Sequence, residues 1–168
     1  MLSKTNGAVS MIESVTIMAC LAIFLTISVA TWQHYASNIS ARMTAYQVKD
    51  ELLTARARAQ HQHTSVVVCG TGDAIHCDGN WSSGRLTFDT AHPQQRIYSA
   101  GWKEKAVVRF TGNLGKNKAM IFEPDGHTRG QEGHFSICAR NLARFAQHCY
   151  HIRVNFFGQI DLREHRHA

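Results

Sequence analysis

A long uncharged run near the N-terminus constrains this chain more than any other feature. No Asp, Glu, Lys or Arg occurs between Ser14 and Ala41, and Ser14–Trp32 is a run of 19 mostly apolar residues. At 1.5 Å per helical residue, such a run can cross a hydrocarbon layer of about 30 Å. From Arg42 onward the sequence carries ordinary charge and is punctuated by glycine. The sequence therefore predicts an apolar stem followed by a polar head.

Two interpretations of the stem are open. Lys4 and the initiator amine precede the run, which favours a single membrane span with the N-terminus in the cytoplasm and the head on the other side. The alternative is a secretory signal peptide cut after Ala30, which would release a soluble periplasmic binding protein beginning at Thr31. Glu13 favours the span, because a carboxylate among apolar residues needs a partner or an interfacial position, for which a signal peptide has no use.

The residues around Glu13 resemble the class III leader of type IV pilins and pseudopilins. In AVSMIESVTIMACLAIFLTISVATW, a small residue ends a short polar leader and a glutamate precedes an apolar helix. Aligning Glu13 with the glutamate at the fifth mature position of that family makes Val9 the first mature residue. The family usually has Gly before the cut, whereas Ala8 stands there in this chain. The alternative is cleavage after Gly7, which would move Glu13 to the sixth mature position. The resemblance implies that prepilin peptidase cleaves after Ala8 and that Glu13 pairs with the N-terminal amine of a neighbouring subunit.

Helical periodicity continues beyond the apolar run. Apolar residues recur at alternating steps of four and three, which places them on one face of a helix: Ala41, Ala45, Val48, Leu52, Ala55 and Ala59. No Gly or Pro occurs between Ala8 and Cys69, so we expect one helix from about Val9 to His61. The expected organisation is a leader at 1–8, a transmembrane and assembly helix at 9–32, an amphipathic second half of the helix at 33–63 and a disulfide-bonded, β-rich head at 64–168.

The head shows the pattern of a β-rich domain. Short runs of β-branched and aromatic residues, separated by Gly, Asn and Asp, predict eight strands. These are Ser65–Cys69, Arg85–Asp89, Arg96–Ser99, Ala106–Phe110, Ala119–Phe122, His134–Cys138, Tyr150–Val154 and Gln159–Leu162. Strands at this spacing favour antiparallel sheets packed on the helix, which makes the fold class α+β.

The cysteines divide between stem and head. Cys20 lies in the stem, and the even number in the head, namely Cys69, Cys77, Cys138 and Cys149, suits an exported, oxidising location. Four cysteines allow three pairings, and proximity along the chain favours Cys69 with Cys77 and Cys138 with Cys149. The alternative is a zinc site that includes His76, His148 or His151. The chain has no Cys-x-x-Cys motif and its histidines are scattered, so we expect no metal. We expect no other cofactor either.

Two segments of the head resemble minor pilins of the FimT and GspH kind. They are VVVCGTGDAIHCDGNWSSGRLTFD and FEPDGHTRGQEGHFSICARN. The resemblance implies a pilin-like fold in which a long N-terminal helix, its first half membrane-spanning, packs against an antiparallel β-sheet or β-sandwich head. It implies a non-enzymatic minor pilin of a type IV pilus, with a minor pseudopilin of a type II secretion system as the alternative.

The same resemblance implies partners and a location. The partners would be major and minor pilins through the N-terminal helix, prepilin peptidase, and inner-membrane lipid before assembly. The chain would lie in the bacterial inner membrane with its head in the periplasm, and at the cell surface once it is assembled into a pilus. The residues agree with a non-enzymatic role, since no serine stands in a Gly-x-Ser-x-Gly context and no Gly-rich phosphate loop precedes a helix.

DNA binding is a second hypothesis for the head. The chain has 18 Lys and Arg against 12 Asp and Glu, a net charge of +6, and phosphate contacts need such cations. The candidates are Arg153, Arg163 and Arg166 near the C-terminus, and Lys103, Lys105, Lys116 and Lys118 with Arg109 in a second basic stretch. Phe156, Phe157 or Trp102 would stack on bases if exposed. The simpler interpretation is a solvated surface with core aromatics.

The family resemblance supports DNA binding only in part. Some FimT-like minor pilins serve DNA uptake and carry a C-terminal Gly-Arg-x-Arg element. Here Gly158 is followed by Gln159, Ile160 and Asp161, so an acid takes the place of the second arginine. Arg163 and Arg166 are the arginines left to compensate.

Overall fold

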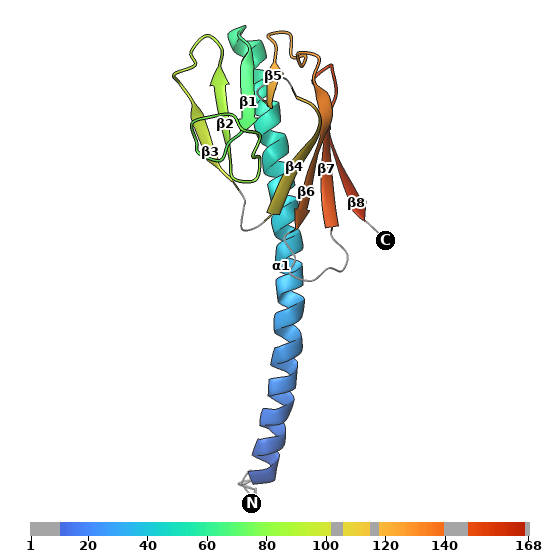
Figure 1. The fold of residues 1–168 in the computed structure, drawn as a ribbon. Helices are drawn as coiled ribbons and strands as arrows, with labels where there is room; N and C mark the ends of the chain where they lie inside the picture. The colour runs from blue at the N-terminus through green and yellow to red at the C-terminus, as the bar shows by residue number, and fades with distance from the viewer. Residues whose placement is uncertain (1–10, 102–105, 115–117, 140–147, 167–168) are drawn as a thin grey trace, which may run out of the picture. The chain divides into compact units, whose positions relative to one another are not determined.

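The computed structural model describes residues 11–101, 106–114, 118–139 and 148–166 (Figure 1). Within these ranges it describes the backbone but not the side chains of residues 26–31, 33, 34, 37, 148, 165 and 166. The chain divides into two compact units, the first ending at Ala36 and the second beginning at Ser37.

Helix α1 (Met11–Gln62) provides the whole described part of the first unit and the beginning of the second. It lacks Gly and Pro throughout, so nothing in the sequence breaks its hydrogen-bond ladder. It ends where His63 adopts a φ of 53°, the left-handed conformation that commonly terminates helices. The single helix predicted from about Val9 to His61 agrees with this element over its described residues.

Large apolar side chains in the first unit are exposed. They include Met11, Ile12, Val15, Met18, Leu21, Ile23, Phe24, Leu25 and Trp32. A helix that is apolar on all sides needs to be covered by other helices or by lipid. Over the residues that the structure describes, no helix meets the length and hydropathy needed to cross a membrane. The predicted run Ser14–Trp32 includes residues 26–31, whose side chains lie outside the described ones, so the span stays a prediction.

The second unit contains two antiparallel sheets of four strands each. The first has the order β3-β2-β1-β5, from β3 (Ile97–Ala100), β2 (Gly84–Asp89), β1 (Val66–Gly70) and β5 (Ala119–Phe122). The second has the order β4-β6-β7-β8, from β4 (Ala106–Asn113), β6 (Glu132–Ala139), β7 (His148–Val154) and β8 (Ile160–Arg166). Figure 1 shows both sheets beside the second half of α1. The predicted α+β class with antiparallel sheets on the helix is confirmed.

Each described strand overlaps one of the predicted runs. The largest differences lie in the second sheet, where β4 continues to Asn113 and β8 to Arg166. The apolar pattern ends earlier in both runs. The strands continue because their partners do, since Asn113 pairs with Glu132 and His148 with Arg166. Register with a neighbour, rather than side-chain type, therefore sets these ends.

One core joins the helix to both sheets. All six residues of the predicted helical stripe, from Ala41 to Ala59, are buried. They pack with Val66 and Val68 of β1 and with Phe135, Ile137, Ile152 and Val154 of the second sheet. Four of the six stripe residues are alanines, which allow the sheets to approach the helix closely. Trp81 closes the cluster, with its ring edge-on to Phe135 at a centroid distance of 4.8 Å.

Both head disulfides join cysteines that are close along the chain. Cys69 of β1 is bonded to Cys77, with their Cα atoms 5.5 Å apart. Cys138 of β6 is bonded to Cys149 of β7, and these residues are direct cross-strand partners with Cα atoms 4.2 Å apart. This is the pairing favoured by sequence proximity. Cys20, in the first unit, is exposed and unpaired.

Candidate functional site

The outer face of the second sheet, which faces away from α1, collects cationic and polar side chains. Alternate residues of β4, β6 and β7 point into the core, so the residues between them point outward. The strand register aligns Arg109 with Ser136, Ser136 with His151, and His151 with Arg163. These four residues form one row across all four strands. A second row places Thr111, His134, Arg153 and Asp161 beside it.

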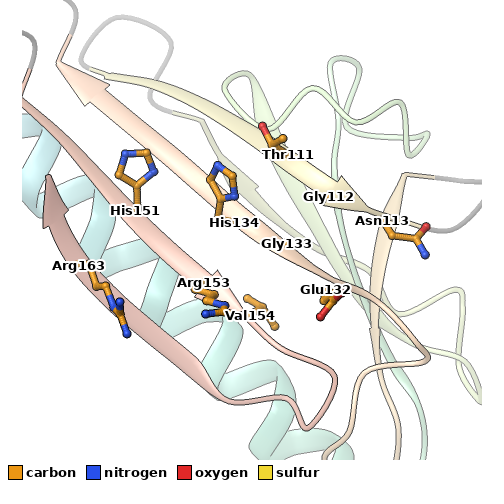
Figure 2. Close-up of a pocket in the computed structure, with 10 residues that line it drawn as sticks. All are labelled: Thr111, Gly112, Asn113, Glu132, Gly133, His134, His151, Arg153, Val154 and Arg163. Carbon is orange, nitrogen blue, oxygen red and sulfur yellow. The ribbon is translucent and has the colours of Figure 1, made fainter. Parts of the chain in front are cut away.

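Part of each row borders an open groove of about 770 Å³: His151 and Arg163 of the first row, and Thr111, His134 and Arg153 of the second. Figure 2 shows His134, His151, Arg153 and Arg163 projecting from neighbouring strands into the same region. Thr111, Gly112, Asn113, Glu132, Gly133 and Val154 complete the lining. We call the set Arg109, His134, Ser136, His151, Arg153 and Arg163 the arginine–histidine face.

Local contacts orient side chains of the arginine–histidine face. Ser136 Oγ and His151 Nδ1 lie 3.2 Å apart, within hydrogen-bond reach. The rings of His134 and His151 have centroids 5.6 Å apart. Arg163 Nε donates to Asp161 Oδ2 at 2.9 Å, so Asp161 partly neutralises Arg163. Because Arg163 remains 73% exposed, the pair is well screened by solvent.

The structure brings together only some of the residues predicted to bind DNA. Arg153, Arg163 and Arg109 share the arginine–histidine face. Lys118 is exposed but lies against Gly79 and does not line the groove. Lys103, Lys105, Lys116 and the Arg166 side chain lie outside the described residues, as does Trp102.

Sequence reasoning missed His134 as part of this face. Its place depends on β6 pairing with β7 so that His134 is opposite Arg153. The alternation of polar and apolar residues along β6 predicts that His134 points away from the core. It does not predict which strand lies beside it.

An exposed aromatic pair lies at the turn between β7 and β8. Phe156 and Phe157 are 50% and 59% exposed, and their rings meet edge to face at 5.5 Å between centroids. The ring of His127 lies 5.9 Å from Phe156 and 5.6 Å from Phe157. These phenylalanines are therefore surface residues rather than core residues.

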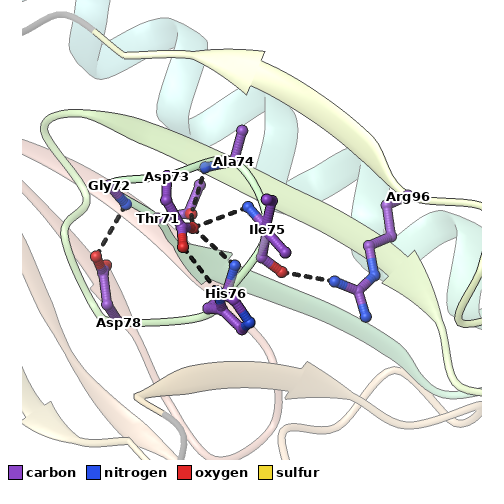
Figure 3. A network of polar contacts seen from close by, with 8 residues as sticks. All are labelled: Thr71, Gly72, Asp73, Ala74, Ile75, His76, Asp78 and Arg96. Atoms are coloured by element: carbon purple, nitrogen blue, oxygen red, sulfur yellow. Dashed lines mark hydrogen bonds and ion pairs between the residues drawn. The ribbon is translucent and has the colours of Figure 1, made fainter.

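A second polar cluster orders the loop closed by Cys69 and Cys77 (Figure 3). The Asp73 carboxylate accepts hydrogen bonds from the backbone N–H groups of Ile75 and His76, at 2.9 and 2.8 Å. It also contacts His76 Nδ1 at 2.7 Å and Thr71 Oγ1 at 3.1 Å. The backbone N–H of His76, followed by its side chain, holds the pKa of Asp73 well below its usual range. These bonds stabilise the loop from within.

No metal site emerges within the part of the chain that the structure describes, where no three His, Cys, Asp or Glu side chains are grouped to hold an ion. At the other end of the chain, Ala8 and Val9 lie outside the described residues. Glu13 is exposed in the first turn of α1, and its backbone carbonyl accepts a hydrogen bond from Thr16 Oγ1 at 2.8 Å.

Two crystal structures of the type IV minor pilin FimU of Pseudomonas aeruginosa share this fold. The first aligns with a TM-score of 0.57 and 14% sequence identity, covering 77% of this chain and 92% of FimU. The second, from another crystal form, aligns with a TM-score of 0.51 and 16% identity, covering 73% of this chain and 91% of FimU. Among curated proteins, none matches the sequence.

The sequence itself matches a family model. Residues 44–158 match the model described as "Type II transport protein GspH". The match begins within α1 and ends in the turn after β7, so it includes every described strand except β8. It covers more than half of the chain, and the fold it spans is that of the FimU minor pilin. The chain therefore belongs to the GspH family of minor pilins and pseudopilins.

Proposed function

We propose that this protein is a non-catalytic minor pilin that assembles into a type IV pilus through the first unit of its helix. The observation that carries the proposal concerns the described side chains of α1 before Ala36. Among them, large apolar ones are exposed on every side of the helix. Such a surface is stable only when lipid or other apolar helices cover it. Lipid of the bacterial inner membrane covers it before assembly, with the head in the periplasm. Helices of major and minor pilins cover it in a pilus at the cell surface.

Glu13 has a specific role in this proposal. It is the acid in the first turn of α1, followed by residues without Asp, Glu, Lys or Arg up to Ala41. In an apolar bundle, an unpaired carboxylate is costly, and a neighbouring N-terminal amine neutralises it. Cleavage after Ala8 by prepilin peptidase would create that amine on Val9.

Mass spectrometry of the N-terminus of the mature protein tests the proposal. A start at Val9, with or without methylation, supports prepilin processing and retention of the helix. A start at Thr31 would mean release by signal peptidase as a soluble periplasmic protein, and it would refute the proposal. Retention in the membrane fraction should accompany the Val9 start.

A minor pseudopilin of a type II secretion machine is the nearest alternative, because the matched family model carries a type II transport description. The two roles share the same helix and head. They differ in which assembly fails when the gene is deleted. Loss of surface pili with normal secretion supports the pilus role, and loss of secretion with normal pili supports the alternative.

DNA binding is a second candidate function, favoured by the arginine–histidine face. Three arginines from β4, β7 and β8 lie on one surface, with two histidines between them. Phosphate contacts position a nucleic acid on such a surface, and their strength falls as salt rises. The test is a fluorescence anisotropy titration of labelled DNA with the full-length protein in detergent. Binding that weakens with salt supports this function, and the absence of binding at low salt removes it.

A further inference from the structure

The exposed pair Phe156–Phe157 is positioned in advance by its backbone. The Phe156 carbonyl accepts a hydrogen bond from the backbone N–H of Thr128 at 3.1 Å. The Phe157 carbonyl accepts one from Arg56 Nη2 at 3.4 Å. The turn is therefore tied to the β5–β6 connection and to α1. Binding at this turn costs little backbone ordering, because hydrogen bonds already hold the turn.

The residues on either side of the pair reinforce this position. Gly158 has a φ of 69°, and a Cβ there would lie 2.0 Å from the Gly126 carbonyl oxygen. Asn155 closes the turn, because its side-chain Oδ1 accepts from the Gln159 backbone N–H at 2.9 Å and its Nδ2 donates to Gln159 Oε1 at 2.8 Å. The aromatic rings thus project from a turn that close packing and hydrogen bonds hold in one conformation.

The aromatic pair follows the outward-facing residues of β7 closely along the chain. Arg153 precedes Phe156 by three residues, a chain length that spans at most about 11 Å. His151 and Arg153 lie on the outer side of the same strand. Acids are also nearby, since Glu132 lines the groove, Asp161 pairs with Arg163, and Asp125 lies 3.0 Å from His127 Nδ1. Cationic side chains therefore lie close along the chain to two solvent-exposed rings at one end of the second sheet.

We propose that this end of the second sheet binds single-stranded nucleic acid in preference to duplex. Arg153 and Arg163 contact phosphates, and unpaired bases stack on Phe156 and Phe157. Bases in a duplex are already stacked and paired, so their faces are closed to these rings, whereas those of a single strand are open. The inference rests on the candidate DNA-binding function and specifies its substrate.

The experiment compares two labelled probes with the full-length protein in detergent at one salt concentration. One probe is a thymine oligonucleotide, and the other is a hairpin duplex with the same number of phosphates. We expect tighter binding of the single strand. Replacing both Phe156 and Phe157 by Leu keeps apolar side chains but removes the aromatic faces. This double variant should weaken single-strand binding about tenfold or more and change duplex binding less than about twofold.

A matched control separates stacking from general surface effects. Tyr98 is 49% exposed on β3 of the first sheet, away from the arginine–histidine face. Tyr98→Leu should change binding of neither probe. Retained duplex binding and an unchanged thermal unfolding midpoint show that the Phe variant is folded.

Four other results would overturn the inference. If neither probe binds, the DNA-binding function itself fails and the inference fails with it. If duplex binds at least as tightly as the single strand, DNA binding stands but the proposed selectivity is wrong. If the Phe variant binds both probes more weakly, and to the same degree, the rings insert as a wedge into duplex DNA instead. If it blocks pilus assembly but binds both probes normally, the rings contact a neighbouring subunit.

Discussion

At the scale of single residues, the partner of each charged side chain decides its role. Arg85 and Asp89 are buried in β2, where the strand faces α1. Arg85 Nη2 donates to Glu51 Oε1 at 2.7 Å, and Arg58 Nη2 donates to Asp89 Oδ2 at 2.8 Å. Burying a charge is costly unless it is paired, so these two ion pairs fix which part of α1 lies on β2. Glu13 differs, because it is exposed in the single chain and its proposed partner is the N-terminal amine of a neighbouring subunit.

Replacing Glu13 by Ala should impair assembly while leaving membrane insertion intact. The change removes the carboxylate proposed to meet the amine of a neighbouring subunit, and it makes the helix more apolar. Cell fractionation measures insertion, and the yield of sheared surface pili measures assembly. Asp50→Ala, on the exposed side of the same helix, is the control and should assemble normally. Normal pilus yield in the Glu13 variant would refute its role.

Replacing Asp73 by Asn should lower the thermal midpoint at neutral pH. The pKa of Asp73 is lowered in the fold, chiefly by the backbone N–H of His76, so its ionised form stabilises the loop. That stabilisation is fully present above the ordinary pKa of 3.8 and is lost as pH falls below it, through the folded pKa. The difference in midpoint between wild type and variant should therefore shrink below about pH 4. A difference that is constant from pH 2 to 7 would contradict this cause.

At the scale of elements, the alanine-rich stripe of α1 sets the distance between helix and sheets. Ala41, Ala45 and Ala59 are fully buried against the core cluster. Their positions could be predicted because helical periodicity is a local property of the sequence. The ends of β4, β6, β7 and β8 could not be predicted in the same way, since the paired neighbour determines them.

Replacing Ala59 by Leu should destabilise the fold by about 1–3 kcal/mol, because the larger side chain overpacks a closed interface. Urea unfolding followed by circular dichroism in detergent measures the change. Ala57→Leu is the matched control, since Ala57 is exposed two residues earlier on the same helix. Equal stability of the two variants would show that the stripe tolerates larger residues.

At the scale of the whole molecule, the two units differ in the side chains that they expose. The first unit exposes large apolar side chains, a surface that is usually covered by lipid or by other apolar helices. The second unit buries its own core and exposes the arginine–histidine face. The net charge of +6 does not by itself locate a binding surface. Strand pairing brings part of this positive charge together on the second sheet, and Asp161 partly neutralises the charge of Arg163.

Replacing Arg153 by Gln should weaken DNA binding and lower the slope of log affinity against log salt by about one, because one phosphate contact is lost. Anisotropy titrations over a salt series measure both quantities. Lys118→Gln is the control, because Lys118 carries the same charge but lies beside Gly79, off the groove. Equal losses in the two variants would show that net charge, rather than the arginine–histidine face, determines binding.

The sequence by itself determined the features that depend on near neighbours. These are the apolar stem, the helical stripe, the approximate positions of the strands and the pairing of cysteines eight and eleven residues apart. Only the tertiary structure decided the row Arg109, Ser136, His151 and Arg163, the partners of Arg85 and Asp89, and the exposure of Phe156 and Phe157. The physical reason is that register and burial arise from contacts between segments far apart in the chain. Local periodicity shows which way a side chain points, but it does not show what lies beside it.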